Sequence, residues 1–305
     1  MLSFYQHLPE HINPIAFSIG NFNIRWYSIM YLVGFSAFYS LIMFRVKRNE
    51  SFLKISNFQF PISNEIPSSK LENLKLIQNS KFKIQNYLVT DFLLYSFIGL
   101  IIGARLGYVL FYNLDYFLQN PLAIVSPFGS DGSFTGIFGM SYFGGLLGII
   151  LAAVIFCRRN RINFRQWADF VVPAIPAGYF FGRIGNFLNG ELYGKATDRF
   201  WGMYFGNELS LRHPTQLYEA FLEGAALFAV LWMFRNNVKF RGSLLSIYLF
   251  GYGIARFLVE FLREPERAPY FGFTTGQIMS LSIIVISLII VLHKNKKAWY
   301  NDFNA

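Results

Sequence analysis

The hydrophobic residues of this chain fall into long apolar runs that are separated by short polar segments. A helix that crosses a bilayer needs about 20 mostly apolar residues. The pattern predicts seven membrane-spanning helices, over Trp26–Phe44, Leu93–Phe111, Met140–Cys157, Phe170–Leu188, Leu217–Phe234, Leu244–Phe261 and Gln277–Leu292. The predicted fold class is therefore an all-α polytopic membrane protein, with residues 1–305 as a single transmembrane domain.

Lysine and arginine cluster in every second connection between these runs. They follow the first, third, fifth and seventh runs, in "RVKR", "RRNRINFR", "RNNVKFR" and "HKNKK", whereas residues 113–137 contain neither. Short loops rich in these residues stay in the cytoplasm. We therefore expect the C-terminus to be cytoplasmic, and the N-terminus and residues 113–137, 194–213 and 262–274 to face outward. Residues 194–213 would then form a short periplasmic head segment.

One segment departs from the alternation of apolar runs and short loops. Residues 49–86 are rich in Asn, Ser, Lys and Ile, show no clear helical period, and lie on the expected cytoplasmic side. This composition favours a low-complexity insertion, either poorly ordered or loosely amphipathic at the surface, over a second catalytic domain.

The composition agrees with a membrane protein. Hydrophobic residues make up 54% of the 305 residues and charged residues only 14%, whereas soluble domains average about 25% charged residues. The net charge of +10 lies in short clusters between apolar runs, which indicates topology, so we expect no nucleic-acid partner. The single cysteine, Cys157, excludes an intramolecular disulfide and is expected to be a small buried hydrophobe.

Charged and amide side chains lie inside several of the predicted helices. They form one stripe at steps of three in the fourth helix and one at steps of four in the sixth, and residues at these spacings share a helical face. The stripes comprise Arg183, Asn186 and Asn189, and Tyr252, Arg256 and Glu260. Charges at membrane depth cost several kcal/mol unless they are paired or hydrated, and so point to function.

Two interpretations of these charges are open. In the first interpretation, arginines and glutamates pair across the bundle and stabilise it. For Glu260 and Arg263, both this structural interpretation and a functional one stay open. Alternatively, arginines hold a phosphate, because the guanidinium group binds phosphate oxygens bidentately. We favour this second interpretation for Arg183 and Arg256, and the phosphate at hand in a membrane is a phospholipid headgroup.

Other sequence signals are weaker. Glycine pairs four apart, Gly103–Gly107, Gly144–Gly148 and Gly178–Gly182, predict helices that approach closely. The sequence contains no phosphate-binding glycine loop, HExxH or CxxC motif, and we expect neither a metal nor a cofactor.

Residues 182–194 read "GRIGNFLNGELYG" and contain the stripe of Arg183, Asn186 and Asn189. This segment resembles the signature G-R-x-G/A-N-F-x-N-x-E-x-x-G of the bacterial prolipoprotein diacylglyceryl transferases and fills every fixed position. The likeness continues through "FSIGNFNIRWYSIMYLVGF", "GARLGYVLFYN", "GMSYFGGLLG", "RHPTQLYE" and "GYGIARFLVEFLREP". It covers nearly the whole chain apart from residues 49–86.

The resemblance implies an integral enzyme of the bacterial inner membrane that carries out the first step of lipoprotein maturation. Such an enzyme moves the diacylglyceryl group of phosphatidylglycerol onto the thiol of the lipobox cysteine in a prolipoprotein, forms a thioether, and releases glycerol-1-phosphate. By this likeness Arg183, Arg256 and Tyr27 would serve catalysis. The substrate site would be shaped by Asn186, Asn189, Glu191, Gly194, Tyr252, Arg105 and Glu260.

One position departs from the family pattern. Where the family usually carries histidine in "S-F-H-G-G-L", this sequence has "SYFGGLLG" with Phe143. Among the four histidines only His213 lies inside a family motif, so it is the reserve candidate for proton transfer. We hypothesise that no histidine base is needed, since arginines nearby would lower the pKa of the attacking thiol. A protein that binds or moves lipid without chemistry, and an inactive relative, remain the alternatives.

Overall fold

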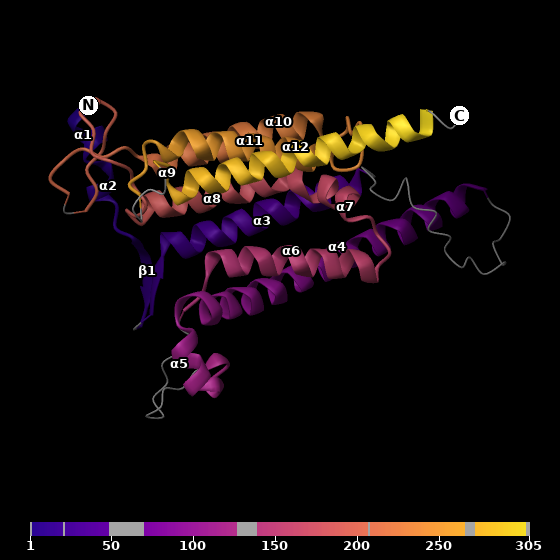
Figure 1. The fold of residues 1–305 in the computed structure, drawn as a ribbon, viewed down its shortest axis with the longest axis horizontal. Helices are drawn as coiled ribbons and strands as arrows, with labels where there is room; N and C mark the ends of the chain where they lie inside the picture. Colours follow the sequence, from indigo (N-terminus) through magenta and orange to yellow (C-terminus); the bar gives the residue numbers. More distant parts are fainter. Residues whose placement is uncertain are drawn as a thin grey trace. The chain divides into compact units, whose positions relative to one another are not determined.

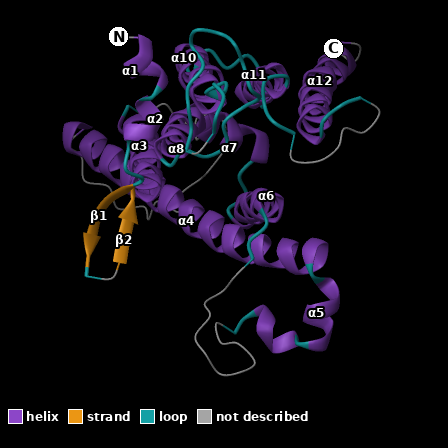
Figure 2. Cartoon of the chain, turned by 90° about the vertical axis from the view of Figure 1, so that its left-hand side faces the viewer, coloured by secondary structure: helices purple, strands orange, loops and turns teal. Residues whose placement is uncertain are grey.

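The computed structural model describes residues 2–20, 22–48, 70–126, 139–206, 208–265 and 272–302, with side chains described outside 70–85 and 294–302. The chain forms two compact units. Unit 1 comprises Met1–Phe52 together with Ala168–Ala305, and unit 2 comprises Leu53–Trp167. The described elements are mostly helices, as Figure 2 shows, which confirms the predicted fold class.

Unit 1 is a bundle of helices that lie side by side (Figure 1). Helix α3 packs against α8, and α11 packs against α12. The bundle elements are α3 (Trp26–Lys47), α8 (Ile175–Leu188), α9 (Thr215–Glu219), the π-helix η4 (Ala220–Ala226), α10 (Leu227–Phe234), α11 (Ser243–Glu260) and α12 (Thr275–Asp302). Its apolar core contains Val172, Leu227, Leu231 and Leu244.

Unit 2 is built on two long helices, α4 (Lys70–Tyr112) and α6 (Tyr142–Arg159), with the short elements α5 (Leu114–Gln119) and η2 (Pro121–Ile124). The two helices cross at facing glycines. A Cβ atom at Gly103 would collide with the carbonyl oxygen of Gly144 and lie 2.7 Å from the Cα of Gly148. The close contacts predicted for Gly103–Gly107 and Gly144–Gly148 are therefore confirmed.

The third glycine pair behaves differently. Gly178 of α8 lies against Gly34 of α3, where a Cβ atom on Gly34 would be 2.9 Å from the Gly178 carbonyl oxygen. A Cβ atom on Gly182 would meet no described atom within 4 Å. The close contact predicted for this pair is therefore present at Gly178. The prediction is wrong for Gly182, which borders open space.

Within the described residues, six helices are long and apolar enough to cross a membrane. They are Trp26–Lys47, Asn86–Tyr112, Tyr142–Arg159, Thr215–Phe234, Ser243–Glu260 and Thr275–His293. They coincide with six of the seven predicted spans, and the chain is a multi-pass membrane protein. The seventh span, and the orientation of the termini, stay predictions.

The remaining predicted span, Phe170–Leu188, is helical but divided. It falls on the end of α7 (Phe164–Val171), on the 3₁₀ turn η3 (Val172–Ala174) and on α8. Pro173 and Pro176 lack the amide hydrogen that a continuous helix needs. Because a helix rises about 1.5 Å per residue, α8 is short for a bilayer whose apolar core is about 30 Å thick.

The predicted insertion at 49–86 is described only in its second part. Residues 49–69 lie outside the described residues. From Lys70 the backbone is helical and continues without a break into the membrane-spanning part of α4. This part is therefore an extension of a spanning helix.

The end of unit 1 that carries residues 194–213, here the head end, also contains the N-terminus (Figure 1). Helices α1 (Leu2–Gln6) and α2 (Leu8–His11) pack there. The backbone amide of Tyr204 donates to the carbonyl oxygen of Gln6 at 2.8 Å, and the His7 and Tyr204 rings stack at 4.6 Å. An antiparallel hairpin of β1 (Ile15–Ile19) and β2 (Phe22–Arg25), which the hydropathy pattern did not predict, leads into α3.

The opposite end of unit 1 is held by Arg45 and Asp169. Arg45 is buried and donates to the carbonyl oxygens of Asp169 at 3.2 Å and Phe170 at 2.5 Å. The Asp169 carboxylate accepts from the backbone amides of Gly242 at 2.6 Å and Leu244 at 2.9 Å, at the start of α11. The "RVKR" cluster that served as a topology signal thus includes an arginine that ties helix ends together.

Candidate functional site

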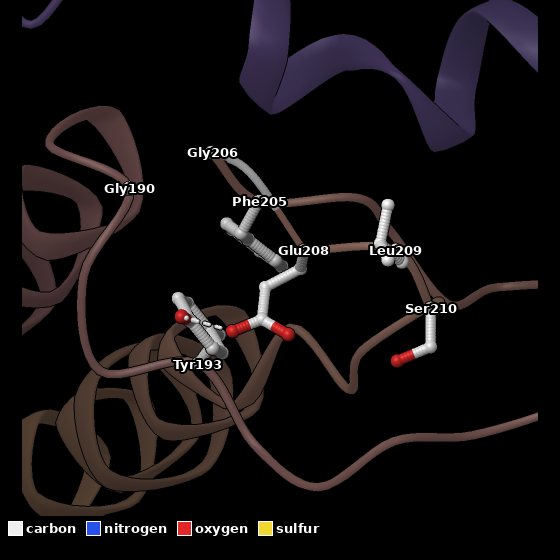
Figure 3. Close-up of a pocket in the computed structure, with 7 residues that line it drawn as sticks. All are labelled: Gly190, Tyr193, Phe205, Gly206, Glu208, Leu209 and Ser210. Carbon is white, nitrogen blue, oxygen red and sulfur yellow. Dashed lines mark hydrogen bonds between the residues drawn. The ribbon is translucent and has the colours of Figure 1, made fainter.

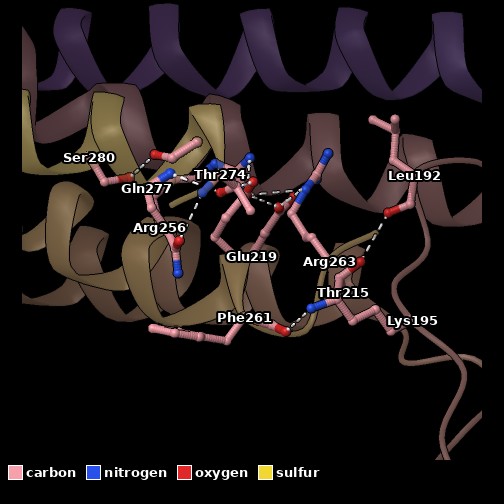
Figure 4. A network of polar contacts seen from close by, with 12 residues as sticks. Leu192, Lys195, Thr215, Glu219, Arg256, Phe261, Arg263, Thr274, Gln277 and Ser280 are labelled. Atoms are coloured by element: carbon pink, nitrogen blue, oxygen red, sulfur yellow. Dashed lines mark hydrogen bonds and ion pairs between the residues drawn. The ribbon is translucent and has the colours of Figure 1, made fainter. Parts of the chain in front are cut away.

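The polar cluster of unit 1 is centred on Glu219, whose side chain is 0% exposed. Arg256 and Arg263 donate to its Oε1 atom at 2.9 and 2.8 Å (Figure 4). Its Oε2 atom lies 2.8 Å from the Nε atom of Arg183. One buried carboxylate therefore contacts three guanidinium groups.

The three arginines are brought together by the packing of α8, α9 and α11. Glu219 ends α9, and the π-helix η4 follows it. Single π turns are frequent at functional sites. Gly224 of η4 lies against Phe180 of α8, where a Cβ atom would be 2.8 Å from the Phe180 Cβ atom. A larger residue at Gly224 would push the Glu219 segment away from α8.

The α11 stripe is ordered by a second carboxylate. Glu260 Oε2 lies 2.7 Å from Arg256 Nη2, and Thr274 donates to Glu260 Oε1 at 2.9 Å. Arg263 Nε lies 3.6 Å from the same Oε2 atom. A Cβ atom on Gly276 would collide with this carboxylate. The predicted pairing of arginine with glutamate is thus present at Glu260 and Arg263, and also at Arg256.

The signature segment folds back on itself beside Arg183. Arg183 Nη1 donates to Asn186 Oδ1 at 3.1 Å, and Asn186 Nδ2 donates to Glu191 Oε1 at 2.8 Å. Asn189 Nδ2 donates to the other oxygen of Glu191 at 3.0 Å. The backbone leaves the helix through positive φ angles at Gly190 (68°) and Leu192 (60°). This turn brings Glu191 back over the stripe that the sequence predicted.

Arg183 also contacts Tyr179, one turn earlier in α8. Its Nε donates to the Tyr179 hydroxyl at 2.8 Å, and that hydroxyl donates to Glu223 Oε2 at 2.5 Å. The ring of Tyr252 meets the Tyr179 ring edge to face, with centroids 6.0 Å apart. The Nη2 group of Arg183 donates to no residue that the structure describes. Arg183 therefore keeps its Nη2 group as a donor for another acceptor.

Gly194 closes the signature against α11. It forms an isolated β-bridge with Arg263, and its amide donates to the His213 carbonyl oxygen at 2.8 Å. A Cβ atom would collide with the Leu262 carbonyl oxygen and lie 2.6 Å from the Thr215 side chain. Gly194 thus permits the close approach that places Arg263 beside Glu219.

Two predicted site residues, Tyr27 and His213, make no hydrogen bond to the arginines of the cluster in the part of the chain that the structure describes. The Tyr27 hydroxyl donates to Tyr31 at 2.9 Å, and the Tyr27 Cα would be 3.5 Å from a Cβ atom on Gly185. The His213 ring contacts Tyr218, with Nδ1 and the hydroxyl 3.2 Å apart. Burial, and then the charge of Arg199, lower the pKa of His213 below its ordinary value.

Arg105 belongs to unit 2, where its guanidinium group binds backbone carbonyl oxygens. It donates to Ile124 at 2.8 Å, Ala123 at 2.6 Å and Gly139 at 3.3 Å. Phe143 begins α6 in the same unit and is exposed. Cys157 is buried near the end of that helix, as expected for a structural thiol.

A cavity of about 470 Å³ lies at the head end, separate from the arginine cluster. Figure 3 shows the residues that line it, Gly190, Tyr193, Phe205, Gly206, Glu208, Leu209 and Ser210. Glu208 accepts from the Tyr193 hydroxyl at 2.9 Å and from Arg212 Nη2 at 2.6 Å. These hydrogen bonds, that of Arg212 foremost, lower the pKa of Glu208. The carboxylate of Glu208 and the hydroxyl of Tyr193 are thus paired within the head.

Four cluster residues were not assigned to the site from the sequence: Glu219, Glu223, Arg263 and Tyr179. Three of them left a signal. Glu219 and Glu223 lie four apart in an apolar run, and Tyr179 lies four residues before Arg183 on the same helical face. Their significance depends on the neighbouring helix, because Glu219 acquires its three partners only when α8 and α11 pack beside it.

The cluster has the character of an anion site. Guanidinium groups that are mostly buried and held by carboxylates can bind a phosphate with charge-assisted hydrogen bonds. Among the residues that the structure describes, no group of three or more His, Cys, Asp and Glu side chains lies together in a way that could hold a metal ion.

The sequence is similar to known proteins of one family. A family model described as prolipoprotein diacylglyceryl transferase matches residues 14–63 and 71–293. The chain is 39% identical to the phosphatidylglycerol–prolipoprotein diacylglyceryl transferase of Chlorobaculum tepidum, covering 97% of this chain and 94% of the relative. It is 37% identical to the Campylobacter hominis enzyme of the same name, over 97% and 96%, and 39% identical to that of Coxiella burnetii, over 90% and 93%.

Proposed function

Because this chain belongs to the prolipoprotein diacylglyceryl transferase family, we propose that it lipidates prolipoproteins. It transfers the diacylglyceryl group of phosphatidylglycerol to the thiol of the lipobox cysteine and releases glycerol-1-phosphate. This is the first step of lipoprotein maturation.

The observation that carries the assignment of the site is the junction of Arg183 and Arg256 at Glu219. In the reaction the cysteine sulfur attacks a glycerol carbon, the thiol proton leaves, and the carbon–oxygen bond to phosphate breaks. The electron pair of that bond passes to the phosphate oxygen. Fixed cations that meet this growing negative charge in a water-poor site lower the barrier strongly.

The other site residues take supporting roles in the proposal. Asn186, Asn189 and Glu191 fix the Arg183 side of the site through their hydrogen bonds, and Gly194 brings the Arg263 side to it. Tyr252 acts through Tyr179. Glu260 orients Arg256. Tyr27 faces the signature from α3.

Two assignments rest on the family likeness alone. For Tyr27 the likeness implies a part in catalysis. For Arg105 it implies substrate binding, although its described partners are backbone carbonyl oxygens of unit 2. Both roles stay predictions.

The proton of the thiol needs no histidine in our proposal. A free thiol with a pKa of about 8.5 is already partly ionised at neutral pH, and nearby cations increase that fraction. His213, whose pKa is lowered, is neutral at pH 7 and is the reserve acceptor. Phe143 cannot take the proton, because its ring carries no ionisable group.

The chain is a multi-pass membrane protein with six long apolar helices in its described part. We propose that the membrane is the bacterial inner membrane, with the head end outside and the Arg45 end in the cytoplasm. The basic residues at the Arg45 end, Lys47, Lys239 and Arg241 among them, support this orientation through the positive-inside rule.

A purified-enzyme assay tests the function directly. The protein is incubated with phosphatidylglycerol and a lipobox peptide, and the products are read by mass spectrometry. A diacylglyceryl-cysteine peptide with stoichiometric glycerol-1-phosphate is the expected result. Lipid moved unchanged between leaflets would favour a transporter, and lipid bound without product would favour an inactive relative.

A further inference from the structure

The arginine cluster contains its own anion, and its role follows from how it divides the three guanidinium groups. We propose that Glu219 is a positioning residue and the resident counter-anion of the phosphate site. It anchors Arg256 and Arg263, leaves Arg183 available to the substrate, and promotes release of the phosphate product. The inference rests on the proposed function and adds the residue that sets the affinity for substrate and product.

The two oxygens of Glu219 do different things. Oε1 accepts hydrogen bonds from both Arg256 and Arg263. Oε2 is in ion-pair distance of Arg183 but accepts no hydrogen bond in the described part of the chain, since the Nε–H group of Arg183 points at Tyr179. Two arginines are thus fixed by Glu219, and the third is neutralised without being held by it.

Arg183 is the arginine with a guanidinium nitrogen that the protein leaves unused. Its Nη2 group has no hydrogen-bond partner among the described residues, although its side chain is about as exposed as that of Arg256, 18% against 17%. By contrast, Arg256 spends Nη1 on Glu219 and Nη2 on Glu260. A phosphate oxygen can therefore bind Arg183 Nη2 without breaking a hydrogen bond of the cluster, whereas at Arg256 it would compete with Glu219 and Glu260.

The charge of the ion-paired set matches the substrate. Three arginines share two carboxylates, Glu219 and Glu260, which leaves one positive charge in excess. Glu223 and Glu191 lie one residue further out, behind Tyr179 and Asn186. A phosphodiester carries one negative charge, so its entry leaves none of the ion-paired charges uncompensated, and an uncompensated buried charge is costly.

The product has a different charge. A phosphate monoester has a second pKa near 6 and carries close to two negative charges at neutral pH. Glycerol-1-phosphate is therefore attracted more strongly than phosphatidylglycerol by bare arginines. The negative charge of Glu219, within ion-pair distance of all three, opposes this retention. Its presence lowers the affinity for both anions and for the product most.

Two variants separate the effect of the charge of Glu219 from the effect of the length of its side chain. Glu219→Gln keeps the size and removes the charge. We expect the inhibition constant of glycerol-1-phosphate to fall about tenfold and the KM for phosphatidylglycerol to fall by less, with a lower kcat because the doubly charged product leaves slowly. Glu219→Asp keeps the charge but is one methylene shorter, so Arg256 and Arg263 lose their anchor. We expect kcat to fall while the inhibition constant stays within about twofold of wild type.

A matched control is available at Glu264, the residue that follows Arg263 in the sequence. Glu264→Gln also removes one negative charge, from a side chain that is 57% exposed and pairs with Arg212. It should change neither constant. An opposite shift is expected for Arg263→Gln, which removes one cation of the cluster and should weaken both phosphatidylglycerol binding and product inhibition.

The outcomes are decisive for each variant. A folded Glu219→Gln protein whose KM and inhibition constant equal those of wild type overturns the proposal and leaves Glu219 a structural residue. If that variant does not fold, unchanged constants in Arg263→Gln overturn it, and weakened binding of both anions supports it. Inorganic phosphate, measured by its effect on the unfolding temperature, gives the same comparison without turnover. A wild type that makes no product would refute the proposed function alone.

Discussion

Arg183 and Arg256 lie against opposite oxygens of one buried carboxylate, although one belongs to α8 and the other to α11. The distances are 2.8 and 2.9 Å. Interpreting these arginines as pairing partners and interpreting them as a phosphate site are therefore not exclusive. The same carboxylate that neutralises the arginines in the bundle also fixes the geometry in which they can meet a phosphate.

Replacing Arg183 should abolish transfer. We expect Arg183→Ala to lose about 100- to 1,000-fold in rate, the usual cost of removing one donor to a developing charge, while the protein stays in the membrane. The measurement is product formation per mole of folded enzyme. Arg158→Ala, which removes an exposed arginine at the end of α6, serves as control. Near-normal turnover in Arg183→Ala would make this residue a structural partner of Glu219 only.

Arg256→Lys should be nearly as damaging as a full truncation. Arg256 reaches Glu219 through Nη1 and Glu260 through Nη2, and a lysine has a single nitrogen that cannot span both carboxylates. Steady-state kinetics with phosphatidylglycerol would show a large fall in kcat. Full activity of the lysine variant would contradict the bidentate argument.

Two glycines of the signature should respond in opposite ways to alanine. Gly194→Ala forces a methyl group onto the Leu262 carbonyl oxygen and the Thr215 side chain, so the unfolding temperature in detergent should fall. Overpacking of this kind costs about 1–3 kcal/mol. Gly182→Ala should leave that temperature unchanged because its surroundings are open. A loss of activity confined to Gly182→Ala would show that substrate uses this space, and equal destabilisation of both would contradict the geometry.

Deleting residues 52–84 should leave most activity, provided that the rest still joins α3 to α4. The membrane-spanning part of α4 begins at Asn86, so the deletion removes only the preceding extension. Product formation and membrane insertion are measured together. Normal insertion with lost activity would mean that this segment carries a function of its own.

The role of His213 is open to a direct test by His213→Gln, alone and combined with Phe143→His. We expect the single variant to keep most activity at pH 7. The positive charges of nearby arginines lower the pKa of the attacking thiol, so that little is left for a base to do. If His213→Gln is inactive and the added Phe143→His change restores its activity, a histidine base is required.

The lowered pKa of His213 adds a pH dependence of stability. The unfolded state takes up the proton first, near the ordinary pKa of about 6.5. Above that pH the ring is neutral in both the folded and the unfolded state, so its titration does not change the free energy of unfolding. As pH falls from 7 through the folded pKa, wild type should lose stability relative to His213→Gln. Thermal unfolding of both proteins across this range provides the check, and parallel curves would contradict the expected shift.

The apolar runs and the polar stripes were readable from the sequence because both are local patterns. Runs of sufficient length predicted the six described spans within three residues at each end, except that the second span begins seven residues earlier than predicted, at Asn86. The step of three from Arg183 to Asn186 put both on one face of α8, where a hydrogen bond of 3.1 Å joins them. The signature at residues 182–194 identified the family, because a motif with so many fixed positions rarely occurs by chance.

Other features required the packing of distant segments. The pattern could not pair Glu219 with Arg183, Arg256 and Arg263, because hydropathy does not say which helices are neighbours. It also missed the N-terminal helices at the head and the division of the fourth span by Pro173 and Pro176. The sequence by itself thus determined which residues are costly in a membrane and on which helical face they lie. Only the tertiary structure decided that one carboxylate offsets the cost of three of them, since a buried charge is stabilised by the partners that folding brings within about 3 Å.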